Sequence, residues 1–271
     1  MDVDILLPTY NGAKYLNSLL DSILNQTFKE WRLIIRDDGS TDDTIKIIHN
    51  YLAGFPEKII LYPNKNTNLG AVGSFSFLMS KVTSEYVMFC DQDDIWLPEK
   101  IENSIIKIHQ SESIHGKLPI LIYSDATIVN ENCETLAKSF YKYEKLNYEW
   151  AKNINISKIQ NTVLGCTVMI NKSALSLSQP IGNNAIMHDW WILLKVLQND
   201  GKIIFINEPT ILYRQHLNNT MGSKKFSFFG LLKKAKDINK YKKMNKDLGF
   251  DDNELKLLFW KFLVIFLRLL K

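Results

Sequence analysis

Two spacings of apolar residues alternate along the first hundred residues of the chain. Runs of consecutive apolar residues predict buried strands at 4–8, 31–36, 59–62 and 86–90. Apolar residues three and four positions apart predict helices at 14–26, 41–52 and 70–79. Strands that alternate with helices through short connections indicate an α/β fold, with a mostly parallel, Rossmann-like sheet flanked by helices on both faces.

The second half of the chain has a less regular pattern. The clearest signals predict strands at 121–125, 202–206 and 210–213 and a helix at 188–198. Residues 129–159 have no clear period, which favours a loop-rich excursion with short helices. Residues 162–170 are compatible with a strand or a packed turn.

Three carboxylates, Asp91, Asp93 and Asp94, directly follow the strand expected at 86–90. Like charges this close repel and raise one another's pKa, so the cluster indicates a bound positive charge. A divalent cation with oxygen ligands fits that need, and Asp91 and Asp93 are the better ligands. The alternative is a solvated turn in which Asp94 only caps the following helix.

Polar residues also end two other expected strands, at Thr9 and at Asp37-Asp38. Ligands of parallel sheets bind outside the carboxyl ends of the strands. We therefore expect Thr9, Asp38 and the acids at 91–94 to line one cleft.

Charge divides the chain of 271 residues into two parts. Residues 224–271 carry 13 Lys and Arg against 5 Asp and Glu, a net charge of +8, whereas residues 1–223 have a net charge of −4. We expect a catalytic domain at 1–223 and a basic, amphipathic, helical segment at 224–271. The odd, scattered set of three cysteines excludes a disulfide framework and indicates reduced thiols in a cytosolic protein. We expect neither a signal peptide nor a membrane-spanning segment.

Several motifs together resemble those of the family 2 glycosyltransferases, which have the GT-A fold. The resemblance covers about the first hundred residues and rests on Pro8-Thr9-Tyr10-Asn11, Asp37-Asp38-Gly39-Ser40-Thr41-Asp42, Asn68-Leu69-Gly70 and Asp91-Gln92-Asp93-Asp94 with Trp96 and Pro98. Later segments are similar to a bacterial rhamnosyltransferase-like branch that builds surface polysaccharides. They are Asn161-Thr162-Val163-Leu164-Gly165-Cys166-Thr167, His188-Asp189-Trp190-Trp191 and Tyr213-Arg214-Gln215-His216.

The resemblance implies that Mg²⁺ or Mn²⁺ binds on the diphosphate of a nucleotide-sugar donor. Asp93 would be the direct metal ligand and Asp91 a supporting one that also contacts the donor. His216 is a further candidate ligand, although a lone histidine is more often structural. Arg214 could neutralise the leaving diphosphate.

Asp38 and Thr9 match residues that bind the donor's nucleobase in this family. A carboxylate can accept a hydrogen bond from the N3–H of uracil or thymine. Taken alone, the segment Asp37-Asp38-Gly39-Ser40 reads as an acidic turn that caps the next helix.

Asp189 matches the catalytic base of the family, because it opens a helix that faces the sugar. An acceptor hydroxyl must lose its proton as it attacks, and a carboxylate opposite the leaving group gives inversion. The alternative is that His188 caps the helix and Asp189 only favours its dipole. Trp190, Trp191 and Gly165 are expected on the acceptor side, although one of the two tryptophans could belong to the core.

The C-terminal residues 257–271 are apolar but too short and too charged to span a bilayer, and lysines precede them. Such a segment favours peripheral contact with an anionic membrane, whereas packing on the body or in a homodimer is the alternative. We expect a cytoplasmic protein at the inner face of the cell membrane, with no nucleic-acid partner.

The sequence thus predicts an inverting, metal-dependent glycosyltransferase. Its donor would be a nucleoside-diphosphate sugar, dTDP-rhamnose or a UDP-sugar, and its acceptor a surface polysaccharide or a lipid-linked precursor. Two alternatives stay open: a metal-dependent phosphohydrolase, and a non-catalytic nucleotide-sugar-binding scaffold of a membrane complex.

Overall fold

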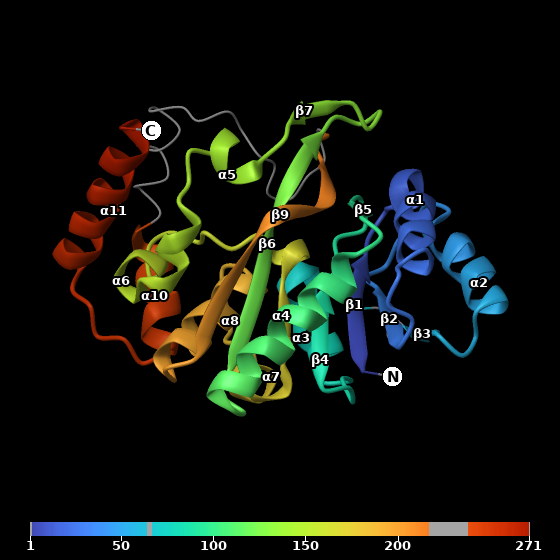
Figure 1. Cartoon of the computed structure of the whole chain (residues 1–271), viewed down its shortest axis with the longest axis horizontal. Coiled ribbons are helices and arrows are strands. Elements are labelled where there is room, and N and C mark those ends of the chain that lie inside the picture. The colour runs from blue at the N-terminus through green and yellow to red at the C-terminus, as the bar shows by residue number, and fades with distance from the viewer. Residues whose placement is uncertain (1, 64–66, 217–237, 271) are drawn as a thin grey trace.

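The computed structural model describes residues 2–63, 67–216 and 238–270, and within these ranges nine strands form one sheet (Figure 1). Their order is β3-β2-β1-β4-β8-β6-β9-β5, and β7 pairs with β6. In chain order the strands are β1 (Val3–Thr9), β2 (Trp31–Asp37), β3 (Ile59–Tyr62), β4 (Tyr86–Phe89), β5 (Ile95–Trp96), β6 (Ile120–Val129), β7 (Thr135–Ala137), β8 (Met169–Asn171) and β9 (Lys202–Arg214).

Helices cover both faces of this sheet. Successive side chains of a strand point to opposite faces, so Ile5 and Leu7 of β1 lie in one buried cluster and Leu6 in the other. The first cluster also takes apolar residues of α1 (Ala13–Leu24), α2 (Thr44–Gly54) and α4 (Lys100–His115). The second takes those of α3 (Gly70–Met79), α7 (Lys172–Ser178) and α8 (His188–Gln198).

Short helices occupy the chain between β7 and β8, as expected from the lack of a regular apolar spacing at 129–159. They are α5 (Phe140–Tyr143), α6 (Ile154–Ser157) and the 3₁₀ turns η1 (Tyr148–Lys152) and η2 (Gly165–Thr167). The C-terminal helices α10 (Ile238–Asp247) and α11 (Glu254–Leu269) pack beside α6 at the left of Figure 1. The start of the expected basic segment, 224–237, lies outside the described residues. Among the described helices, none has the length and apolarity needed to cross a membrane.

Strand direction explains where the site forms. β3, β2, β1 and β4 are parallel neighbours, so the chain leaves β1, β2 and β4 at the same edge of the sheet. Thr9, Asp37 and the acids after Phe89 therefore meet there, as the sequence predicts.

The sheet is less parallel than expected beyond β4. β8 lies antiparallel between β4 and β6, and β5 and β7 also pair antiparallel with their neighbours. The two strands expected at 202–206 and 210–213 are one strand, β9, which stays paired with β6 through a register shift near Pro209. Pro209, which lies between the two expected strands, is accommodated by a bulge.

Candidate active site

The acid cluster lies on a loop that is held at both ends. It follows β4 and leads into β5, which pairs with the end of β9. Between the acids, the Gln92 side chain accepts a hydrogen bond from Tyr10 N and donates one to Tyr10 O, both at 2.9 Å. This clamp fixes the loop against the end of β1.

The prediction that Asp94 caps the next helix is wrong. Residues 95–96 form β5, and α4 begins only at Lys100 with Glu99 as its N-cap. Asp94 is instead fully buried, and its Oδ1 accepts a hydrogen bond from Arg214 N at 3.2 Å. The helix expected at 41–52 also begins later, at Thr44, with Asp43 as its N-cap.

Asp93 and His216 come together from opposite halves of the chain. His216 Nε2 lies 2.7 Å from Asp93 Oδ2, and the imidazole stacks on Tyr15 with ring centroids 4.8 Å apart. Arg214 Nε donates to the backbone oxygen of Asp93 at 2.9 Å and Nη1 to that of Glu131 at 2.7 Å. The guanidinium is buried, and these two hydrogen bonds hold the acid loop in place.

Asp91 and Asp94 lie side by side, with one oxygen of each and the Cys166 Sγ all within 4.8 Å of one another. Burial, and then the charges of Asp93 and Asp189, raise the pKa of Asp91 to about 7. Burial likewise raises the pKa of Asp94 well above its ordinary value. Burial and mutual repulsion therefore disfavour the ionised forms of Asp91 and Asp94.

These residues fit the divalent cation that the resemblance implies. Asp94 Oδ2 is buried and has no hydrogen-bond partner in the described part of the chain. Carboxylates are the ligands that Mg²⁺ and Mn²⁺ prefer, whereas the Cys166 thiol is a soft ligand whose pKa burial raises well above its ordinary value. The carboxylates that lie close enough together to share a cation are Asp91 and Asp94, while Asp93 of the same loop is paired with His216.

The residues expected to bind the nucleobase lie at the ends of β1 and β2, where Asp37 and Asp38 are already hydrogen-bonded. Thr9 Oγ1 donates to Asp37 Oδ1 at 2.9 Å. Asp38 pairs with Arg36 and accepts hydrogen bonds from the backbone N–H groups of Leu69 and Gly70, both at 2.8 Å. Asp38 therefore links β2 to the start of α3.

Asp189 lies in the first turn of α8, where the sequence predicts it. Its Oδ2 accepts a hydrogen bond from Asn161 Nδ2 at 2.9 Å. Burial raises the pKa of Asp189 to about 6, although the Asn161 hydrogen bond opposes the rise. The charge of Asp189 also acts on Asp91, so the two carboxylates are neighbours.

Gly165 is needed because the backbone of η2 approaches this carboxylate closely. A β-carbon at residue 165 would lie 3.1 Å from Asp189 Oδ2. That is tighter than ordinary van der Waals contact, so any larger residue must displace the carboxylate or the turn.

The neighbours of Asp189 on α8 are core residues. Trp190 and Trp191 are 6% and 3% exposed, and their indole N–H groups donate to the backbone oxygens of Ser157 and Ser178. Neither ring offers an open face for a sugar. His188 is buried against Phe75, with ring centroids 3.7 Å apart, and burial lowers its pKa to about 3.

Sequence reasoning gave no role to several residues that build the site. Three of them contact residues far along the chain, namely Gln92, Asn161 and Tyr15. A fourth, Arg36, pairs with the neighbouring Asp38. Lys100 is also fully buried beside the acids, with its Nζ donating to Cys166 O at 3.0 Å. A lysine in the first turn of a helix carries no pattern that predicts this burial.

Comparisons with known proteins show which family and fold the chain resembles. The model of the family described as "Glycosyl transferase family 2" matches residues 4–168. The chain is 28% identical to the dTDP-rhamnosyl transferase RfbG of Shigella flexneri, over 92% of this chain and 88% of that protein. It is 26% identical to WfgD of Escherichia coli, named a UDP-Glc:α-D-GlcNAc-diphosphoundecaprenol β-1,3-glucosyltransferase, over 83% of this chain and 81% of that protein.

Solved structures share the fold. A Staphylococcus aureus TarS fragment in complex with UDP-GlcNAc superposes with a TM-score of 0.61 at 18% identity, covering 95% of this chain and 69% of that one. The mannosyltransferase PcManGT of Pyrobaculum calidifontis, in complex with GDP-Man and Mn²⁺, gives 0.64 at 13% identity, covering 98% and 69%. The fold is therefore GT-A, as the sequence motifs predict.

Proposed function

The chain belongs to glycosyl transferase family 2, and on that premise we propose that it is an inverting, metal-dependent transferase with dTDP-rhamnose as its leading donor. Its relatives include a dTDP-rhamnosyl transferase and a glucosyltransferase that is named for UDP-Glc and a diphosphoundecaprenol-linked acceptor. The observation that carries the proposal is the meeting of Thr9, Asp38 and the acid loop at one sheet edge, with Asp189 beside them.

The donor would lie along that edge. Its nucleobase would lie at Thr9 and Asp38, and its diphosphate would reach Asp91, Asp93 and Arg214. Because the Asp38 carboxylate already accepts backbone hydrogen bonds, its part would be to shape the pocket together with the segment before α3. The dTDP-rhamnosyl relative favours thymidine and rhamnose over a UDP-sugar.

A cation would be held by Asp93, Asp91 and His216. When bound, it supplies positive charge that stabilises the diphosphate as the bond to the sugar breaks. Arg214 would keep Asp93 in position through the backbone hydrogen bond described above.

Asp189 would act as the general base. Its carboxylate takes the proton of the acceptor hydroxyl while the hydroxyl oxygen bonds to the anomeric carbon. The bond from that carbon to the diphosphate breaks on the opposite side, so the anomeric configuration inverts. A pKa of about 6 leaves Asp189 mostly ionised near neutral pH, and basic enough to accept a proton.

The test is release of nucleoside diphosphate from a panel of nucleotide-sugars with Mn²⁺ or Mg²⁺. We expect Asp93→Asn and Asp189→Asn each to lower turnover at least about 100-fold. The matched control, Asp251→Asn, changes a carboxylate of an exposed residue and should leave turnover unchanged. Absence of turnover with every nucleotide-sugar would contradict the proposal. Metal-dependent nucleotide binding alone would then favour a scaffold, and phosphate release from simple esters a hydrolase.

We also propose that residues 1–223 form the catalytic domain and that residues 224–271 hold it at the inner, cytoplasmic face of the cell membrane. The support is the outer face of α11, which carries large apolar side chains at helical spacing. Phe259, Phe262 and Phe266 are 62%, 54% and 57% exposed, and Leu255 and Leu270 lie near the two ends of the same helix.

Charge complementarity indicates an anionic bilayer as the partner of that face. α10 packs against α11 and leaves four lysines exposed, at 240, 242, 243 and 246. Basic residues beside an apolar helical face are typical of helices that lie in a membrane interface. A lipid-linked acceptor would be present at the same surface.

A further inference from the structure

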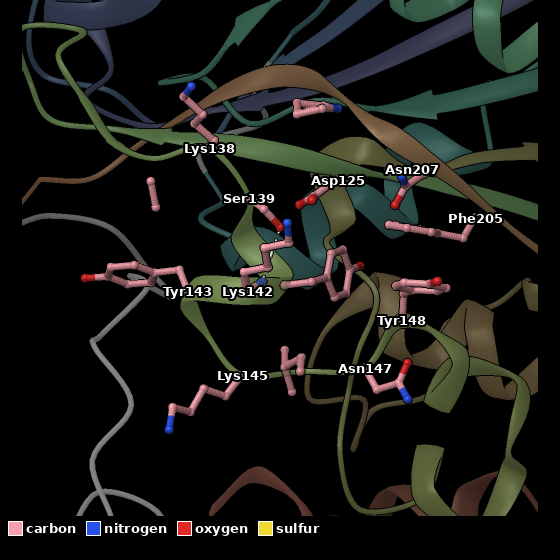
Figure 2. Close-up of a pocket in the computed structure, with 14 residues that line it drawn as sticks. Asp125, Lys138, Ser139, Lys142, Tyr143, Lys145, Asn147, Tyr148, Phe205 and Asn207 are labelled. Carbon is pink, nitrogen blue, oxygen red and sulfur yellow. Dashed lines mark hydrogen bonds between the residues drawn. The ribbon is translucent and has the colours of Figure 1, made fainter. Parts of the chain in front are cut away.

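A cavity of about 590 Å³ opens on the side of β9 that faces α5 (Figure 2). None of the residues that the sequence assigns to the donor or the metal lines it. Its volume lies in the range of small-molecule sites. Its walls come from the end of β7, from α5 and the turn after it, and from β9 between Phe205 and Pro209.

Three lysines line the cavity. Figure 2 shows Lys138 at the upper left, Lys142 near the middle and Lys145 at the lower left. The ammonium groups of Lys138 and Lys142 make no ion pair with any residue that the structure describes. Among the described lining residues the one carboxylate is Asp125, which is buried and accepts hydrogen bonds from the backbone of Ala126 and Phe140. The lining therefore favours an anion.

The lining also offers an aromatic wall and amide groups. Tyr148 stacks on Phe205 with ring centroids 4.2 Å apart, and Tyr148 remains 36% exposed. Asn147 and Asn207 flank this pair in Figure 2. Aromatic faces with nearby hydrogen-bonding amides suit a sugar ring, which has apolar C–H faces and polar hydroxyls.

Two connections place this cavity in the path of the reaction. Tyr141 lines it and donates to Thr162 O at 2.8 Å, and the preceding residue, Asn161, holds the proposed base Asp189. Glu144, between two lining residues, accepts a hydrogen bond from Arg268 of α11 at 3.2 Å. The cavity thus lies between the base and the helix with the exposed phenylalanines.

We propose that this cavity binds the acceptor, and that the acceptor is a saccharide carrying a phosphate. The phosphate lies against Lys142, with Lys138 in the same lining, and a sugar ring lies against Tyr148 and Phe205. This inference rests on the proposed function, because it supplies the acceptor side of that reaction. The phosphate belongs either to a lipid-linked saccharide or to a soluble one, and both present the same charge.

Calorimetry with α-glucose 1-phosphate tests the inference on the full chain. The titration uses Asp93→Asn without metal, so that phosphate binding at the acid loop is suppressed. We expect binding that weakens at least about tenfold in Lys138→Gln/Lys142→Gln, since two cationic contacts are lost. The matched control, Lys107→Gln/Lys117→Gln, removes the same charge from exposed residues at α4 and just beyond its end, and should bind normally.

Further arms separate the alternatives. Inorganic phosphate should bind more weakly than α-glucose 1-phosphate, and Tyr148→Ala should weaken only the sugar phosphate. Equal losses in both lysine pairs, or equal binding of inorganic phosphate, would overturn the inference. Flotation with phosphatidylcholine vesicles that carry polyprenyl phosphate identifies the source. Capture that depends on Lys138 and Lys142 assigns the phosphate to a lipid, and its absence assigns it to a soluble saccharide.

The outcome can be told apart from failure of the proposed function. Sugar-phosphate binding without turnover of any nucleotide-sugar would contradict the transferase and leave the cavity as a sugar-phosphate site. Normal nucleoside diphosphate release together with unchanged binding in Lys138→Gln/Lys142→Gln would retain the transferase and overturn this acceptor site.

Discussion

Asp189 combines burial with a hydrogen bond from Asn161, and this balance sets its pKa at about 6. A general base works only as the anion, so transfer should be slow below about pH 5 and reach a plateau above about pH 7. The measurement is kcat/KM against pH at saturating Mn²⁺, which keeps the neighbouring Asp91 ionised. A profile that is flat across this range would rule out Asp189 as the titrating base.

Ionisation of Asp91 should lower the stability of the fold, whereas ionisation of most carboxylates raises it. Its pKa of about 7 lies above that of an unfolded aspartate, so ionisation opposes folding as pH rises from about 4 to about 7. In the metal-free protein at about pH 8, Asp91→Asn should therefore raise the free energy of unfolding by about 1–3 kcal/mol.

Urea denaturation with a chelator measures this difference. The gain should vanish near pH 4, where Asp91 is protonated in both states. A gain of the same size at both pH values would show that packing, and not charge, is responsible.

For single residues, the sequence predicts the members of the proposed site better than it predicts their contacts. Asp93, His216, Asp91 and Asp189 all stand out from residue type and position, and the structure brings them to one region. The bond between His216 and Asp93 joins residues 123 positions apart, which no local pattern reveals. Asp94 was misread because a carboxylate before an apolar segment looks the same whether a strand or a helix follows.

Among the elements, the turn η2 offers a sharp test of positioning. Gly165→Ala places a methyl group 3.1 Å from Asp189 Oδ2 and should shift the carboxylate. A misplacement of about 1 Å can cost about 100-fold in rate, so we expect turnover to fall by about 10- to 100-fold, with a much smaller change in the melting temperature.

Gly54→Ala is the matched control, because a β-carbon there meets no atom within 4 Å. It should leave turnover unchanged. Full activity of Gly165→Ala would mean that the close approach of η2 does not position the base.

The elements expected before residue 90 match the structure to within about three residues, whereas β5 and α4 had no predicted bounds. β3 and α3 begin and end where their apolar spacing predicts. β8 has only three residues, too few to show a period, and its antiparallel place in the sheet depends on tertiary pairing. The sequence predicted two strands where β9 is one, because proline is compatible with a turn and also with a bulge inside a strand.

For the whole molecule, the exposed face of α11 predicts binding to vesicles that contain anionic lipids. Phe259→Ser/Phe262→Ser/Phe266→Ser should abolish flotation with such vesicles, because it removes most of the apolar area of that face. Turnover of a soluble donor should persist, since these side chains are exposed on α11 and none belongs to the proposed site.

Ile106→Ser/Ile114→Ser is the control, because it removes exposed apolar side chains from α4 instead. Its flotation should match that of the unaltered chain. A dimer that dissociates in the triple variant, with no vesicle binding by either protein, would identify the face as a contact between copies and contradict membrane docking.

The attachment of α11 to the body has a consequence for acceptor length. Lys261 is buried, with Nζ donating to Ile159 O at 2.9 Å, and Arg268 holds the segment beside α5. The helix is thus part of the rigid body that carries Asp189. On a bilayer, the height of the reacting hydroxyl above the lipid would be a constant of the fold. An acceptor anchored in that bilayer would react only when its chain of sugars spans that height. The enzyme would therefore select acceptors by the length of that chain.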